Sequence, residues 1–422
     1  MTDSYSPKAA RNVAMLVIVA SLGYFVDIYD LLVFSIVRKV SLLDIGVSPA
    51  NVLSEGIYII NFQVSGLLIG GIVWGVIGDK LGRIKVLFGS ILLYSLANFA
   101  NGFVHDVNSY ALIRFIAGIG LAGELGAGIT LVTETMSREK RGYGAMIVSA
   151  IGLLGAAGAV FAARYGWRNA YFAGAGLGIM LLLLRLGTFE SGLFKNIEQA
   201  NVSKGNFFML FTNVKRFKKY LFCILIGAPS WLVTGVLVNL APEFGIALKA
   251  KEPLSAGDGI MYLYIGIAVG GILAGLLSQI TRSRKLAMLV FLVLLIGGEI
   301  VYLNSTGITN SQFIRICILM GLGAGFWPIF ITIAAEQFGT NIRSTVATTV
   351  PNFVRALLMP INFGFIAFKT QYGMVTSAYI MMGLLNVIAM ISLSQLKETF
   401  GKDLNYLEVD ENAEPALAIE PV

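Results

Sequence analysis

Long apolar segments alternate with short polar segments along the whole chain. Twelve apolar segments can be recognised, with approximate limits at residues 13–37, 55–77, 86–104, 109–133, 143–163, 169–186, 220–241, 259–280, 286–304, 312–335, 346–368 and 374–395. A helix needs about 20 apolar residues to cross a bilayer. The pattern therefore predicts an all-α membrane protein with twelve transmembrane helices in two six-helix halves.

The polar segments predict the domain limits and the orientation. The longest gap, residues 188–219, is expected to be a cytoplasmic linker between an N-terminal half at 1–187 and a C-terminal half at 220–400. An acidic cytoplasmic tail is expected at 401–422. Alternate loops are rich in lysine and arginine, for example Lys80, Arg83 and Lys85. Because such loops stay in the cytoplasm, both termini are predicted to lie there.

The composition agrees with a membrane protein and argues against other classes. Hydrophobic residues make up 56% of the chain and charged residues 13%, whereas soluble domains contain about 25% charged residues. The net charge of +7 comes from bases between the apolar segments, so it indicates membrane topology rather than a nucleic-acid partner. Two cysteines and one histidine form no disulfide framework or metal motif. We expect no metal site, no cofactor and no enzymatic activity.

Two acids interrupt the first apolar segment. Asp27 and Asp30 are three residues apart, so they lie on one face of a helix. A carboxylate at the centre of a membrane helix costs about 2.5–3.5 kcal/mol on insertion scales, and such acids usually face a partner or a wet cavity. We expect this face to line a path for a solute.

The two halves look like repeats. Arg315 lies 201 residues after Arg114, and both begin a glycine-rich segment. Glu336 follows Glu134 by 202 residues, and Arg343 follows Arg141 by the same interval. Internal repeats of this kind are common in secondary transporters.

Several motifs resemble the major facilitator superfamily over nearly the whole chain. The segment Gly-Asp-Lys-Leu-Gly-Arg-Ile-Lys at 78–85 resembles that family's loop between its second and third helices. Arg114 with Gly118 and Gly120 resembles its fourth-helix motif. Asp-Ile-Tyr-Asp at 27–30 resembles the metabolite:proton symporters, and Glu134 with Arg141-Gly142 resembles that branch and the sugar porters.

The resemblance implies a proton-coupling site in the N-terminal half. In the resembled branches the fourth-helix arginine pairs with an acid of the first helix, which makes Arg114 and Asp30 the first candidates. Asp27 and Glu124 are the next candidates for the proton site. Arginine does not readily lose its proton, whereas a carboxylate can be neutralised by one. The alternative is a static structural ion pair.

Gates and substrate contacts are predicted from position. Charged residues at the cytoplasmic helix ends are interpreted as an inner gate: Asp79, Arg83, Glu134, Arg141, Glu336 and Arg343. Polar and aromatic residues at mid-depth are the candidate substrate contacts: Tyr24, Tyr29, Asn61, Gln63, Trp231, Asn239, Trp327, Asn352, Arg355 and Asn362. A base at position 355 favours a substrate carboxylate.

These features predict a proton-coupled secondary active transporter that imports a small polar metabolite, with an amino acid or organic acid favoured, by alternating access. The alternatives are a drug or metabolite efflux antiporter and a sugar:proton symporter on the same fold, or a non-transporting membrane sensor. The expected partners are a small-molecule substrate, protons and the lipid bilayer. We expect a monomer in the cell membrane, with the short outer loops favouring a bacterial inner membrane.

Overall fold

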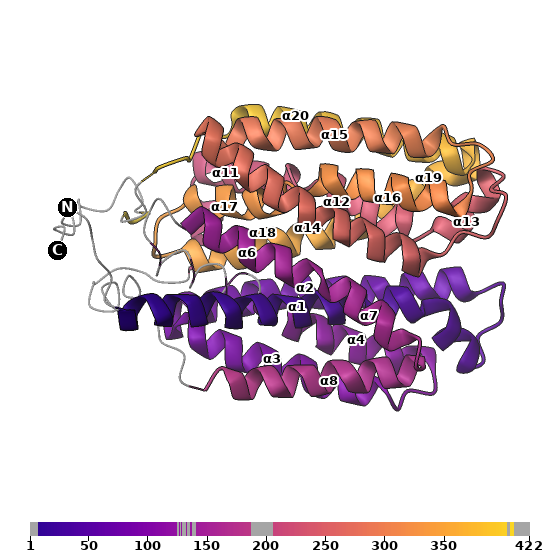
Figure 1. Cartoon of the computed structure of the whole chain (residues 1–422), viewed down its shortest axis with the longest axis horizontal. Coiled ribbons are helices and arrows are strands. Elements are labelled where there is room, and N and C mark those ends of the chain that lie inside the picture. Colours follow the sequence, from indigo (N-terminus) through magenta and orange to yellow (C-terminus); the bar gives the residue numbers. More distant parts are fainter. Residues whose placement is uncertain are drawn as a thin grey trace.

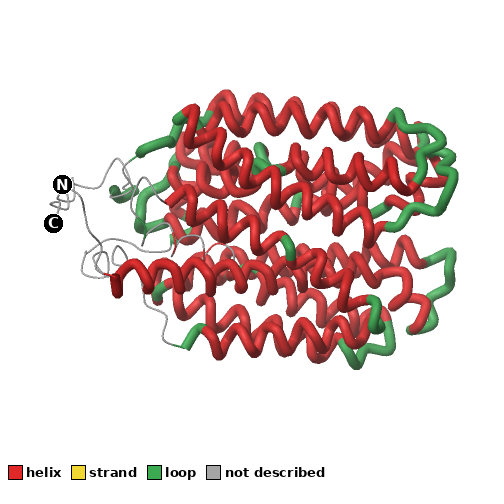
Figure 2. The backbone as a smooth tube through the Cα atoms, viewed as in Figure 1, coloured by secondary structure: helices red, strands yellow, loops and turns green. Residues whose placement is uncertain are grey.

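The computed structural model describes residues 7–124, 126, 128, 132, 136, 141–186, 206–402 and 406–408. For residues 7–13, 83, 141, 142 and 145 it describes the backbone alone. The described part of the chain is helical (Figures 1 and 2). Its N-terminal part contains α1 (Pro7–Asp44), α2 (Val52–Leu81), α3 (Arg83–Asn101), α4 (Val107–Leu121), α6 (Arg141–Leu153), α7 (Gly155–Ala163) and α8 (Trp167–Leu184).

The C-terminal part begins with short helices and continues with long ones. It contains α10 (Met209–Thr212), α11 (Val214–Leu225), α12 (Ala228–Leu232), the π-helix η1 (Val233–Val238), α13 (Ala241–Ala247), α14 (Ala256–Thr281), α15 (Arg284–Leu303), α16 (Asn310–Ala324), α17 (Trp327–Glu336), α18 (Arg343–Ala356), α19 (Leu358–Tyr372) and α20 (Met374–Gln395).

The helices run along one common direction, as expected for a membrane protein (Figure 1). Among the described residues, 11 helical segments are long and apolar enough to span a membrane, and Val107–Leu121 is a shorter apolar helix. The all-α membrane architecture is therefore confirmed, while the count of twelve helices stays a prediction. Helix α1 begins, and α20 ends, at the same end of the bundle, although the side of the membrane on which this end lies also stays a prediction (Figure 1).

The two parts of the chain form adjacent helical groups that meet along α2, α18, α6 and α14. Helix α2 packs on α18, and α6 packs on α14. Glycines permit the closest approach: Gly75 of α2 faces the backbone of Thr345 in α18, so that a Cβ there would lie 3.0 Å from the Thr345 Cα. Small residues at helix crossings of this kind are typical of membrane bundles.

Several membrane-crossing segments are broken near their middle. Helix α16 gives way to α17 at Gly325–Phe326, and α18 to α19 at Leu357. Proline lies at the start of α12 and of α17, and Pro351 lies inside α18. Proline lacks a backbone N–H and interrupts the hydrogen-bond ladder of a helix. Broken helices in transporters usually surround the binding site at mid-depth.

The predicted linker and tail are described only in part. Within the predicted linker, residues 188–205 lie outside the described residues, and α10 and the start of α11 lie in the rest. Within the predicted tail, residues 406–408 pack against the loop between α17 and α18, where the Thr340 N–H donates to the Tyr406 carbonyl oxygen at 2.8 Å. The proposed domain limits stay a prediction.

Candidate transport site

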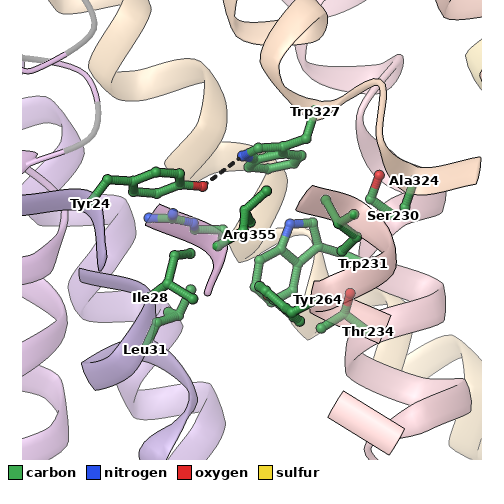
Figure 3. A pocket seen from close by; sticks show the side chains of 12 residues that line it. Tyr24, Ile28, Leu31, Ser230, Trp231, Thr234, Tyr264, Ala324, Trp327 and Arg355 are labelled. Carbon is green, nitrogen blue, oxygen red and sulfur yellow. Dashed lines mark hydrogen bonds between the residues drawn. The ribbon is translucent and has the colours of Figure 1, made fainter. Parts of the chain in front are cut away.

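A cavity lies between the two groups of helices, at the level where the helices are broken. Its empty volume, which includes space open to solvent, is about 340 Å³. The lining residues come from α1, α6, α12, η1, α14, α16, α17 and α18: Tyr24, Ile28, Leu31, Leu153, Ser230, Trp231, Thr234, Tyr264, Ile267, Ala324, Trp327 and Arg355. Figure 3 shows aromatic rings on several sides of the Arg355 side chain. We call this space the central cavity.

Arg355 is the cationic residue of the central cavity. Its side chain is 1% exposed. One guanidinium nitrogen donates to the Asn352 Oδ1 at 3.0 Å, and the other lies 3.5 Å from the Asp27 Oδ2. Asp27 is fully buried, and its second oxygen has no hydrogen-bond partner among the described residues. Arg355 and Asp27 therefore form a long contact between two buried charges. Each side chain keeps a polar atom that has no hydrogen-bond partner among the described residues.

A hydrogen bond joins the two halves beside this pair. The Trp327 indole N–H donates to the Tyr24 hydroxyl at 3.1 Å, linking α17 to α1 (Figure 3). Asn352 makes a second link, because its amide donates to the Ala122 carbonyl oxygen at 2.8 Å. Both contacts therefore join the two halves at the level of the central cavity.

A second cavity adjoins the first and shares Leu31, Trp231 and Thr234 with it. Its empty volume, which includes space open to solvent, is about 410 Å³, and Gln63 and Asn239 also line it. The Asn239 side chain is 4% exposed, and its Oδ1 has no hydrogen-bond partner among the described residues. Leaving a buried polar atom unpaired costs about 1–3 kcal/mol, so such an atom is a candidate ligand contact.

Arg114 lies beside Asp30 but does not hold its carboxylate. Its guanidinium donates to the Asp30 carbonyl oxygen at 2.8 Å, to the Asn98 Oδ1 at 3.2 Å and to the Gln63 Oε1 at 3.3 Å. Its Cζ lies 5.7 Å from the centre of the Tyr171 ring. Neither Asp30 carboxylate oxygen has a hydrogen-bond partner among the described residues.

The Asp30 carboxylate is directed toward α8 instead. A Cβ added at Gly174 would lie 2.5 Å from the Asp30 Oδ1. The structure therefore brings the predicted acid and arginine together through the backbone of α1. The Asp30 carboxylate is fully buried and has no counter-ion within ion-pair distance among the residues that the structure describes.

Glu124, a further candidate for the proton site, pairs with a base that was not among the predicted site residues. It forms a bidentate ion pair with Arg185 at the end of α8, and both side chains are 1% exposed. Gly23 of α1 provides the space, because a Cβ there would overlap the Glu124 carboxylate and the Arg185 guanidinium. Arg185 was not predicted as a site residue. A base that follows four leucines near the end of a predicted span is nevertheless a pattern from which it could have been found.

One predicted gate residue joins the two halves at the end of the bundle where α1 begins. The Asp79 carboxylate of α2 accepts hydrogen bonds from the backbone N–H groups of Ser344 and Thr345 at 3.1 and 2.8 Å. The Thr345 hydroxyl adds a third bond at 2.6 Å. These groups form the N-terminus of α18, where free N–H groups and the helix dipole favour a negative charge.

The opposite end of the bundle has its own contact between halves. Arg38 of α1 lies 3.5 Å from Glu243 of α13, and Gly56 leaves room for the arginine side chain. In contrast, the Glu336 carboxylate lies 3.5 Å from Arg284 within the C-terminal part. Arg343 donates to the Phe338 carbonyl oxygen at 3.4 Å, also within that part.

A match to a family model identifies the family to which the chain belongs. The model for the Major Facilitator Superfamily matches residues 13–361, which is most of the chain. The chain belongs to the Major Facilitator Superfamily. It is a multi-pass membrane protein and a transporter rather than an enzyme, as the sequence predicted.

Curated members of the superfamily resemble the chain over most of its length. The sialic acid transporter NanX of Escherichia coli is 26% identical over 344 residues, covering 77% of this chain and 79% of the relative. The benzoate transport protein of Acinetobacter baylyi is 22% identical over 373 residues, covering 78% of each chain. A solved structure of the proton:xylose symporter XylE superposes with a TM-score of 0.71 at 17% identity, covering 94% of this chain and 98% of that one.

The structure places the other predicted residues in three groups. Tyr24, Trp231, Trp327 and Arg355 line the central cavity, while Gln63 and Asn239 line the adjoining one. Tyr29, Asn61 and Asn362 line neither, and the Tyr29 hydroxyl donates to the Ala170 carbonyl oxygen inside the N-terminal half. Glu134 lies outside the described residues, as do the side chains of Arg83 and Arg141.

Four further polar residues of the site were missed from sequence. Ser230, Thr234 and Tyr264 line the central cavity, and Arg185 holds Glu124. Hydroxyl groups are common in membrane helices, because they can donate to their own backbone. Their presence in an apolar segment therefore carries little information about which of them face a cavity.

Proposed function

We propose that this protein imports a small carboxylate-bearing metabolite together with a proton. The observation that carries the proposal is the position of Arg355 in the central cavity. Its guanidinium is almost fully buried and has a long contact with Asp27. Four aromatic residues also line the cavity: Tyr24, Trp231, Tyr264 and Trp327. A substrate carboxylate would give Arg355 a closer, bidentate partner.

The same pair provides a physical link between proton and substrate. A buried guanidinium is costly unless an anion or several acceptors surround it. A proton on Asp27 would remove the charge that faces Arg355, and a substrate carboxylate would then restore it. Proton and anionic substrate would thus bind together, which is the requirement for symport.

Alternating access would use the contacts at the two ends of the bundle. Asp79 at the N-terminus of α18 closes the end where α1 begins, and the Arg38–Glu243 pair joins the halves at the other end. Import would require each set to open in turn. We assign the Asp79 end to the cytoplasm, because the lysine- and arginine-rich loops lie there.

Asp30 is the second proton candidate. Its carboxylate is fully buried and has no partner among the described residues, and Arg114 holds the adjacent carbonyl oxygen. A change in its charge would act directly on the position of α1. Asp30 would then couple protonation to the movement of α1, and Asp27 would couple it to substrate binding.

The relatives support an anionic substrate. Sialic acid and benzoate, named for the two curated relatives, both carry a carboxylate. The structural neighbour is named for a sugar, but at 17% identity its similarity concerns the fold alone.

The first experiment tests the substrate class with matched compounds. Thermal-shift measurements on purified protein would compare benzoate with benzamide, nicotinate with nicotinamide, and sialic acid with its methyl ester, alongside amino acids and sugars. We expect stabilisation by at least one carboxylate and by none of its uncharged analogues. Arg355→Gln should abolish the shift, while Arg315→Gln, at an exposed position, should retain it. Equal shifts for acid and amide would contradict the proposal.

The second experiment tests the coupling in proteoliposomes. With the carboxylate found above, wild-type protein should accumulate it when the outside is acidic. Asp27→Asn and Asp30→Asn should each lose accumulation, while Asp30→Asn retains exchange of labelled for unlabelled substrate. Accumulation that reverses direction with the pH gradient would indicate an efflux antiporter, and undiminished accumulation in both variants would exclude these acids as proton sites.

A further inference from the structure

A buried carboxyl group lies in the C-terminal half, between α15 and α20. The Glu299 Oε2 of α15 accepts a hydrogen bond from the Asn386 Nδ2 of α20 at 2.8 Å. Glu299 is 0% exposed and Asn386 is 4% exposed. The two helices pack on each other (Figure 1). Neither residue lines the central cavity or the cavity that adjoins it, so this pair is separate from the transport site described above.

The hydrogen bonds of this pair leave two acceptor atoms without a donor. The Asn386 Nδ2 also donates to the Met382 carbonyl oxygen at 2.9 Å, so both N–H groups of the amide are used. The Glu299 Oε1 and the Asn386 Oδ1 have no hydrogen-bond partner among the described residues. They are the second polar atoms of a carboxyl group and an amide group that already share one bond. What the pair lacks is a hydrogen-bond donor.

In the described part of the chain, no base pairs with Glu299. Lys285 is the nearer base on α15 and lies 14 residues before it, which is about 21 Å along a helix. Arg315 of α16 is exposed, and its Nε donates to the Ser311 carbonyl oxygen. The other ionisable residues of the helices that pack on α15 carry no positive charge, and none of them bonds to Glu299: Asp258, Tyr262, Tyr264, Cys317, Glu336 and Tyr379.

An ionised carboxylate is costly in these surroundings. Taking an ion out of water costs several kcal/mol unless a counter-charge and hydrogen bonds repay it. A neutral carboxylic acid avoids this cost and brings one O–H donor. A single proton would therefore remove the buried charge of Glu299 and also supply the donor that the pair lacks.

We propose that Glu299 is a proton-binding site of the C-terminal half. The proton lies on the Glu299 Oε1 and is donated to the Asn386 Oδ1, while the Asn386 amide donates to the Glu299 Oε2. The carboxylic acid and the amide then form a closed pair with two hydrogen bonds, and the proton holds α15 against α20. This site is distinct from Asp27 and Asp30, which belong to α1.

Infrared spectroscopy of the purified full-length protein tests the protonation state directly. A neutral carboxylic acid has its own C=O stretching band, which shifts in D2O. At pH 7 we expect Glu299→Gln to lose one component of this band, whereas Glu252→Gln, at an exposed position, should lose none. Asn386→Leu should retain the component at a changed frequency, because it removes the hydrogen-bond partner. An unchanged band in Glu299→Gln would overturn the proposal, by showing that Glu299 is ionised.

The pH dependence of unfolding gives an independent test. A glutamate in an unfolded chain loses its proton near about pH 4.3, so the wild-type protein must take up a proton at Glu299 when it folds at neutral pH. Its unfolding temperature should therefore fall relative to that of Glu299→Gln as the pH rises from about 5 to about 8, and Glu252→Gln should follow the wild type. A difference that stays constant over this range would contradict the bound proton.

A metal cation is the other ligand that would neutralise the pair, because carboxylate and amide oxygens suit hard cations. Replacing choline by sodium at constant ionic strength, with and without magnesium, distinguishes the two. We expect no change in the unfolding temperature of the wild type relative to that of Glu299→Gln. Stabilisation of the wild type alone by either metal would overturn the proposal in favour of a cation site.

Discussion

The two halves share their helix packing but differ in the polar groups that the packing surrounds. In the N-terminal half, Gly118 of α4 lies against the Gln63 carbonyl oxygen and Gly120 against Tyr94. In the C-terminal half, Gly321 of α16 lies against the Leu263 carbonyl oxygen and Gly323 against Leu295. These contacts define equivalent positions independently of any charged motif.

The glycine contacts correct the alignment of the two arginines. Gly118 and Gly321 are 203 residues apart, as are Gly120 and Gly323, whereas Arg114 and Arg315 are 201 apart. The structural equivalent of Arg114 is therefore Cys317, which is fully buried. Arg315 takes the place of Leu112, which is 55% exposed. A shift of two residues turns a side chain by about 200° around a helix, so Arg315 is exposed while Arg114 is buried.

The polar cluster around Arg114 consequently has no full copy in the second half. By the same contacts, Asn98 corresponds to Glu299 and Gln63 to Leu263. Glu299 is fully buried and accepts a hydrogen bond from the Asn386 amide at 2.8 Å in place of an arginine. The repeat therefore preserves close helix packing, whereas the polar cluster around Arg114 belongs to the N-terminal half.

The largest expected effect concerns the Glu124–Arg185 ion pair. Arg185→Leu leaves a buried carboxylate without this partner, so the free energy of unfolding should fall by about 3–5 kcal/mol. The double variant Glu124→Gln/Arg185→Leu should recover much of this loss, because it removes the buried charge. Denaturant unfolding in detergent measures both.

The comparison variant in the other half is Asn386→Leu. It removes a single hydrogen bond from Glu299, so a smaller loss of about 1–3 kcal/mol is expected. An equal or larger loss than for Arg185→Leu would contradict the difference drawn between the halves.

A smaller effect separates Arg114 from Arg315. Arg114→Gln removes donors from the Asn98 side chain and the Asp30 carbonyl oxygen, so unfolding free energy should fall by about 2–3 kcal/mol and proton-driven accumulation should be lost. Arg315→Gln should change stability by less than about 0.5 kcal/mol, as an exposed substitution does. Denaturant unfolding and uptake into proteoliposomes measure the two variants. Similar losses of stability and uptake in Arg114→Gln and Arg315→Gln would mean that the sequence motif, and not the glycine packing, defines the repeat.

The smallest effect concerns the two carboxylates that bind helix N-termini at the Asp79 end. Asp79 binds α18 across the halves, whereas Glu398 binds the start of α15 within its own half. Partial burial opposes ionisation of Glu398, but hydrogen bonds from the Ser283 hydroxyl and the N–H groups of Arg284, Phe400 and Lys285 lower its pKa to about 2.

Because the pKa of Glu398 is lower in the folded than in the unfolded protein, its contribution to stability is complete above about pH 4.5 and is lost as the pH falls toward 2. Glu398→Gln should therefore lower the unfolding temperature at pH 7 and have less effect at pH 3. The loss should stay below about 1 kcal/mol, because the side chain is exposed and water screens it. A difference between variant and wild type that grows on acidification would be inconsistent with this pKa shift.

Sequence patterns predicted the parts of the site that depend on unusual residue types. An acid or base in an apolar segment is costly in lipid, and this cost drew attention to Asp27, Asp30, Arg114 and Arg355, all of which are buried. The Gly-Asp motif drew attention to Asp79, and the structure shows that its carboxylate binds the N-terminus of α18. Hydroxyl and apolar cavity residues such as Thr234 and Ile28 gave no such signal, because they occur throughout membrane helices.

The sequence by itself determined that this chain is a helical membrane transporter, because hydropathy depends only on local composition and the family's motifs are continuous in the chain. Partner choice was decided by tertiary structure alone: Arg355 faces Asp27, Arg185 holds Glu124, and Arg114 binds the Asp30 backbone. The reason is geometric. A charged residue must be neutralised or solvated, but any of several residues far away in the chain could do this, and only the rotation and crossing of the packed helices select one.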